Sequence, residues 1–264
     1  MSEAKASRMV SDRVAITNNV VAAVDIHGPE IAPTLEMILF PGGVPQDLTL
    51  AKVLAAFGDH LRARASQLVT ADRTHMIELA DDEGYRAKRD DCTAETRDFL
   101  STLRSGLARN YGQVVAGAYG LGAPIPEDPH TVLVLADNVE NLLRNRPLTE
   151  PPKNKSLKID PIAAADDLKA SASALKTALG DVERERREAQ LTQTAKNEAM
   201  VAWGTSYSGV ADAAAAFFLL AGRPALAERV RPTARRRAGL PEPEDTVEGS
   251  AEATPTGAGG SSTP

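Results

Sequence analysis

Apolar residues recur every three, four or seven positions along most of this sequence, whereas the strict alternation of apolar and polar residues that marks a half-buried β-strand is nearly absent. Glycine and proline gather at a few joints and towards the end of the chain. This spacing is typical of amphipathic helices, and the sparse turn residues argue against an all-β fold. We therefore predict an all-α protein.

Two long helical hairpins are predicted, each with an apolar start, a charged middle and an apolar return helix that ends in glycine and proline. They cover residues 48–122 and 161–222. The segment 81–91 (DDEGYRAKRDD) is too polar to pack in a core, so it is either the tip of the first hairpin or a solvated extension of a helix. Two antiparallel hairpins packed side by side give a helical bundle. The similar plan of the two halves leaves a duplication open.

Composition divides the chain into four parts. Residues 1–146 hold N-terminal helices and the first hairpin, and residues 147–160 form a linker with three prolines. Residues 161–237 hold the second hairpin and a basic segment, and we expect them to pack with the first part into one bundle. Residues 238–264 carry five acidic residues, no lysine or arginine and few apolar residues, which predicts a disordered tail.

No pattern of reactive side chains favours catalysis. Asp72, His75 and Glu78 share one helical face, as metal ligands in helical bundles can, but no second helix offers a matching set and solvated polar side chains are the preferred interpretation. Cys92 follows two aspartates, which raise rather than lower the pKa of a thiol. The glycine-rich stretch 117–124 lacks the spacing of a nucleotide-binding loop. We expect no catalytic residue, no cofactor and no metal.

The clearest charge feature is the basic segment 223–237, which has six arginines and one glutamate. Arginine clusters bind phosphate backbones and acidic partners by charge. No aromatic residue within 220–264 is available to stack on bases, and the acidic tail follows at once, so binding of nucleic acid is the alternative hypothesis. The candidate polyanion-binding residues are Arg229, Arg231, Arg235, Arg236 and Arg237.

The segment 199–222 is long enough to span a membrane, but it contains Asp212 and three glycines, which favours a packed helix and no membrane span. The charged N-terminus has no apolar stretch behind it, and the chain has one cysteine. These features predict a cytoplasmic protein.

Phe217 and Phe218 lie next to each other in an alanine-rich helix, so one is expected to enter the core and the other to contact a partner. No motif is specific enough to indicate a family. The resulting hypothesis is a non-enzymatic structural or interaction protein, a helical scaffold or assembly subunit that binds a protein partner or itself.

Overall fold

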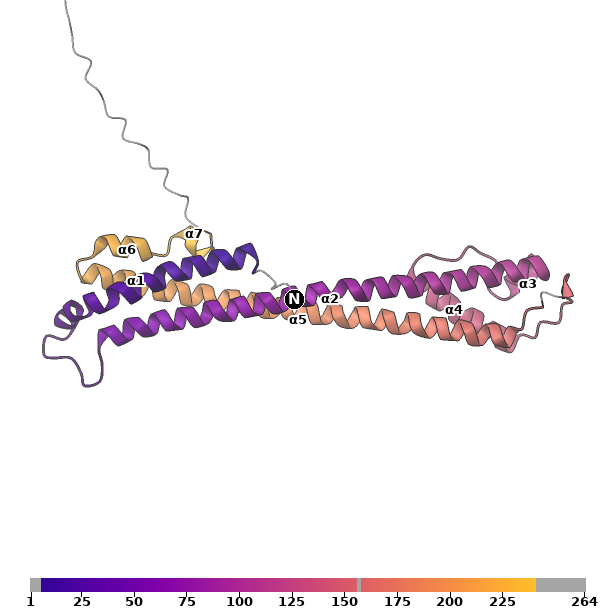
Figure 1. Cartoon of the computed structure of the whole chain (residues 1–264), viewed down its shortest axis with the longest axis horizontal. Helices are drawn as coiled ribbons and strands as arrows, with labels where there is room; N and C mark the ends of the chain where they lie inside the picture. The colour runs from indigo at the N-terminus through magenta and orange to yellow at the C-terminus, as the bar shows by residue number, and fades with distance from the viewer. Residues whose placement is uncertain (1–5, 156–157, 241–264) are drawn as a thin grey trace, which may run out of the picture.

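The computed structural model describes residues 6–155 and 158–240, and within these ranges the chain forms seven helices and no strand. The all-α fold predicted from the periodicity is confirmed. From residue 241 on, the tail predicted to be disordered lies outside the described residues. The helices are α1 (Arg8–Leu39), α2 (Leu50–Asn110), α3 (Gln113–Ala118), α4 (Pro129–Asn145), α5 (Pro161–Leu220), α6 (Pro224–Val230) and α7 (Ala234–Arg237) (Figure 1).

Two long antiparallel helices form the axis of the molecule. With 61 residues in α2 and 60 in α5, each helix is about 90 Å long at a rise of 1.5 Å per residue. They run side by side in opposite directions from one end of the protein to the other (Figure 1). The predicted start of α5 is correct, because the Asp160 side chain accepts hydrogen bonds from the backbone N–H groups of Ile162 and Ala163 just inside the helix.

The hairpins predicted within each half of the chain are wrong, because the polar segment 81–91 is the middle of α2 and α5 continues without a break to Leu220. Charged residues propagate a helix as well as most apolar ones do. Here the charged residues also form ion pairs. Arg86 pairs with Asp82 one turn earlier in α2, and Lys88 pairs with Asp181 of α5. Each half of the sequence therefore supplies one long helix, and the two halves pair with each other.

Apolar side chains are buried at the two ends of the α2–α5 pair. At one end α1 and α6 pack on the start of α2 and the end of α5, and at the other end α3 and α4 pack on the end of α2 and the start of α5. The described residues thus form two separate cores, one at each end of the α2–α5 pair. We name the ends the α1 head (α1, α6, α7 and residues 50–71 and 200–220) and the α4 head (α3, α4 and residues 93–110 and 161–179).

The middle of the molecule has no apolar core. Between Leu68 and Leu100 of α2, and between Leu179 and Trp203 of α5, no hydrophobic residue is buried in these two fully described helices. Of the described helices, α2 and α5 run through this part of the molecule (Figure 1). We call this part, residues 72–92 and 180–199, the stalk.

Aromatic residues anchor both heads. In the α1 head, Trp203 stacks on Tyr207 with ring centroids 5.1 Å apart, and its indole N–H donates to the Thr17 hydroxyl at 2.9 Å. In the α4 head, the buried Tyr119 donates its hydroxyl proton to the carbonyl of Arg146. Segment 199–222 is thus a packed helix, as predicted. In the described ranges, none of the helices combines the length and the apolar character that crossing a membrane requires.

Candidate functional site: the polar interface of the stalk

The side chains that α2 turns towards α5 follow a seven-residue repeat from head to head. Leu61 and Leu68 occupy core positions of this repeat in the α1 head, and Leu100 and Leu107 occupy core positions in the α4 head. This is the pattern of a coiled coil. In and beside the stalk the same repeat places four polar residues that are nevertheless buried: Asp72, His75, Thr93 and Thr96.

Asp72 and Lys196 form a buried ion pair where the stalk meets the α1 head. The Lys196 ammonium lies 2.6 Å from the Asp72 carboxylate, and Asp72 has no exposed surface. The backbone N–H and the hydroxyl of Ser7 donate to the same carboxylate at 2.7 and 3.0 Å. Burial alone would raise the pKa of Asp72, but Lys196 and the hydrogen bonds from Ser7 outweigh it and hold that pKa below its ordinary value. The pair joins the chain before α1 to α2 and α5.

His75 lies one turn further along α2, with only 6% of its surface exposed. Its Nδ1 is 3.0 Å from the hydroxyl of Thr192 in α5, and that hydroxyl donates its proton to the carbonyl of Ala189. The hydrogen bond between His75 and Thr192 joins α2 to α5 within the interface. The interpretation of Asp72 and His75 as solvated side chains is wrong, because their spacing continues the core repeat and turns them towards α5.

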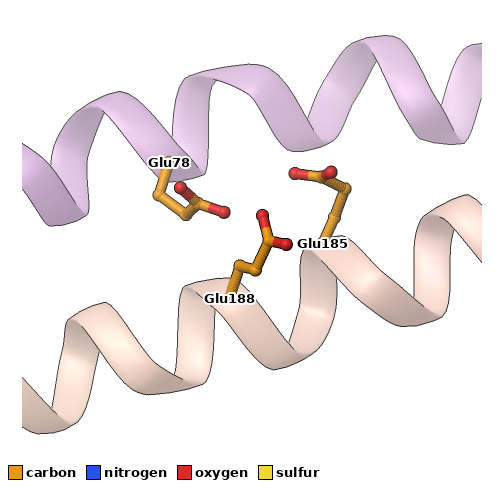
Figure 2. A group of neighbouring side chains, drawn as sticks. All are labelled: Glu78, Glu185 and Glu188. Atoms are coloured by element: carbon orange, nitrogen blue, oxygen red, sulfur yellow. The ribbon is translucent and has the colours of Figure 1, made fainter.

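Three carboxylates meet across the stalk. Glu78 extends from α2 and Glu185 and Glu188 extend from α5, and one oxygen of each lies within 4.8 Å of the others (Figure 2). Glu185 is buried, and one oxygen of Glu78 is buried with no hydrogen-bond partner in the described structure. The cluster therefore concentrates negative charge in the interface between the two helices.

This arrangement favours a protonated carboxyl. Burial raises the pKa of Glu185, and the negative charges of Glu188 and Glu78 raise it further, against the opposing effects of Arg184 and Tyr85. Three carboxylates so close together can share a proton, or their oxygens can coordinate a hard divalent cation. Both events would relieve the repulsion between α2 and α5.

The sequence contains a signal for this interface. Lys196 follows Leu168 and Leu175 by whole multiples of seven residues, so the apolar repeat of α5 continues through it. Glu185 similarly follows the buried Ala178 by seven. Treating the charged stretch as a continuation of the coiled coil would have identified both residues as buried.

The candidate polyanion-binding arginines lie together around α6 and α7 in the α1 head. Arg231 pairs with Glu228 at 3.1 Å, and Arg237 pairs with Asp212 of α5 at 3.1 Å. The guanidinium of Arg236 donates to the backbone carbonyls of Arg229 and Arg231, which holds the two short helices together. The basic segment is therefore a folded part of the head.

Neither candidate partner-contact phenylalanine is freely exposed. Phe218 is fully buried, and Phe217 is partly buried and stacks on Phe57 with ring centroids 6.4 Å apart. The exposed apolar residues of this segment are Leu219 and Leu220, about half exposed. The predicted difference in burial between the two phenylalanines is present, but the outward side chains are the leucines that follow.

The structure also places two other features of the sequence, and the expected lack of catalysis at Cys92 stays a prediction. Cys92 is a half-buried free thiol on α2. The glycine-rich stretch 117–124 ends α3, with Gly120 at a φ of 80° and the N–H of Leu121 bonded to the carbonyl of Ala116. It is a helix-terminating loop.

No protein-family model, no curated protein and no solved structure matches this chain.

Proposed function

We propose that this protein is a non-enzymatic spacer, a scaffold or assembly subunit that holds two heads apart and binds a protein partner or a second copy through them. The observation that supports this proposal is the separation of the two apolar cores by a stalk in which no hydrophobic residue is buried. Two continuous helices connect the heads, so the distance between them is set by helix length.

A contact surface for such a subunit is available at the outer end of the α1 head. The end of α1 and the connection to α2 expose large apolar side chains, of which Met37 is 72% exposed. Exposed apolar residues that cluster in one segment are typical of protein-binding surfaces. We propose that this end surface contacts the partner; it consists of Met37, Ile38, Leu39, Val44 and Leu48.

The experiment compares two double variants with matched loss of exposed apolar surface. Ile38→Ser with Leu39→Ser changes the end surface, and Ile77→Ser with Leu79→Ser changes equally exposed side chains of the stalk. Light scattering after size exclusion measures self-association, and proximity labelling in cells measures association with other proteins. We expect the first variant to lose the association and the second to keep it, with both remaining helical. Equal behaviour of the two variants would contradict the proposal.

An alternative function, binding to nucleic acid through phosphate contacts, is favoured by the grouping of Arg229, Arg231, Arg235, Arg236 and Arg237 on α6, α7 and their connection. Such binding weakens steeply with salt. Binding of an oligonucleotide that falls with salt concentration and is lost on Arg235→Ala would support this alternative.

A cytoplasmic location is part of the proposal. It rests on the single cysteine, Cys92, which leaves the described fold without a disulfide. Fluorescence microscopy of the tagged chain tests it.

A further inference from the structure

A groove of about 310 Å³ lies between α1 and the α6–α7 segment. Asn19, Ile26 and His27 of α1 form one wall. The other side presents Leu226, Arg229 and Arg236. The groove therefore combines apolar side chains with two guanidinium groups, which suits an extended acidic segment with some apolar residues.

Two acidic side chains close in sequence to the lining residues already have partners. Glu30 pairs with His27, and Glu228 pairs with Arg231, each at 3.1 Å. In the part of the chain that the structure describes, no acidic side chain lines the groove. The described lining of the groove thus has a net positive charge, which Arg229 and Arg236 supply.

The end of α7 is fixed beside this groove. Arg13 of α1 is only 8% exposed, and its guanidinium donates to the carbonyl of Ala238 at 3.1 Å. Gly239 has a φ of 76° and lies so close to that guanidinium that a Cβ there would be 2.4 Å from the Arg13 Cζ. The N–H of Leu240 bonds to the carbonyl of Arg235. The chain therefore leaves the α1 head at a defined place, next to Arg13.

The residues that follow carry the complementary charge. Residues 241–264 contain five carboxylates and no lysine or arginine. The groove begins at Asn19 and ends at His27, which places it about 9–21 Å beyond Arg13 along α1 at 1.5 Å per residue. An extended chain covers about 3.3 Å per residue, so roughly three to six residues after Leu240 reach it. Glu244 and Asp245 fall within this range of residues, and Glu248 follows two residues beyond it.

We propose that the acidic segment 242–248 of this chain docks in the groove between α1 and the α6–α7 segment and pairs with Arg229 and Arg236. The docked segment acts as an intramolecular competitor. A polyanion or acidic protein that binds these arginines must first displace it, and the tether gives the segment a high effective concentration.

Photo-crosslinking of the full chain tests the docking. We replace Val247 by p-benzoylphenylalanine, irradiate, and map the crosslinks by mass spectrometry in a mixture of ¹⁵N-labelled and unlabelled protein. We expect crosslinks within one molecule to residues 19–27 and 224–230. Arg229→Gln should reduce their yield several-fold, and Arg223→Gln, on a residue outside the groove lining, should not. Crosslinks spread over other surfaces, crosslinks between labelled and unlabelled molecules, or equal yields in the two arginine variants would overturn the proposal.

Binding of a fluorescent oligothymidylate tests the competition. The triple variant Glu244→Gln, Asp245→Asn, Glu248→Gln should bind this polyanion several-fold more tightly than the natural chain. A matched control, Asp81→Asn, Glu83→Gln, Asp91→Asn, removes the same charge from exposed positions of the stalk. We expect the control to bind as the natural chain does. Equal affinities of the two triple variants would show that the segment does not compete and would overturn this part of the proposal.

Discussion

Lys196 of α5 places its ammonium 2.6 Å from the carboxylate of Asp72 of α2, at the point where the apolar core of the α1 head ends. Both residues occupy positions of a seven-residue repeat that leucines fill elsewhere in the same helices. A single buried polar pair in a coiled coil fixes which turns of the two helices face each other. We therefore expect this pair to favour one register between α2 and α5.

Replacing Lys196 by methionine should destabilise the protein strongly. The substitution leaves the Asp72 carboxylate buried without its counter-ion, which costs about 3–5 kcal/mol in free energy of unfolding. Urea denaturation followed by circular dichroism measures the loss. Arg86→Gln, which breaks an exposed pair with Asp82, is the control and should cost less than about 1 kcal/mol.

The double variant Asp72→Leu, Lys196→Leu should recover most of that stability, because a packed apolar pair avoids the cost of burying charge. A double variant as unstable as Lys196→Met would show that the unpaired Asp72 carboxylate is not the cause of the lost stability.

Replacing Glu185 by glutamine should stabilise the protein at neutral pH. The pKa of Glu185 is raised by burial and then by Glu188 and Glu78, so its contribution to stability is complete below the ordinary glutamate pKa of about 4.3 and is lost as pH rises through the raised value. Glutamine mimics the protonated form at every pH. The expected gain in melting temperature is therefore present at pH 7 and absent near pH 4.

Glu83→Gln is the matched control for this titration, since it removes one negative charge from an exposed position of the stalk. A gain for Glu83→Gln equal to that for Glu185→Gln would attribute the effect to overall charge and not to the carboxylate cluster.

Backbone amides of the stalk should exchange hydrogen faster than those of the heads. Residues 76–92 of α2 include no buried residue, whereas α2 buries several leucines in each head. Segments with few buried apolar contacts open at lower free energy. Hydrogen–deuterium exchange with mass spectrometry tests this difference, and uniform protection along α2 would contradict it.

The two heads should lose their structure in separate transitions. Trp203 is the single tryptophan and lies in the α1 head, so its fluorescence reports that head, whereas circular dichroism reports all helices. Leu107→Ala creates a cavity in the α4 head that costs about 2–5 kcal/mol. We expect this variant to shift part of the circular dichroism transition and to leave the fluorescence transition in place. A common shift of both signals would indicate one cooperative unit.

Much of the fold follows from local signals in the sequence. The Asp128–Pro129 and Asp160–Pro161 pairs predict the starts of α4 and α5, and the Asp128 side chain does accept a hydrogen bond from the N–H of Thr131. In the two heads the apolar stripes correctly predict the core faces of both long helices, whereas Met76 and Leu79, which continue the stripe of α2 into the stalk, are exposed. These features depend on neighbouring residues alone.

The arrangement of the long helices depends on distant partners and was predicted incorrectly. The polarity of segment 81–91 suggests a turn only while its partners are unknown, since Lys88 reaches Asp181 of α5 and Tyr85 bonds to Arg184. Asp72 similarly looks solvated until Lys196 lies opposite. Local spacing identifies a helical face, but the register between two helices decides whether a charge on that face is buried.

Small-angle X-ray scattering of the full chain tests the two-headed shape most directly. Helices of 61 and 60 residues give a maximum dimension of about 90 Å or more, and mass spread along that axis gives a radius of gyration of roughly 25–30 Å. The pair-distance distribution should show a second maximum from distances between the heads. A single maximum with a radius of gyration of about 18 Å, the value for a compact domain of this length, would mean that the helices fold back into one bundle and would contradict the spacer architecture.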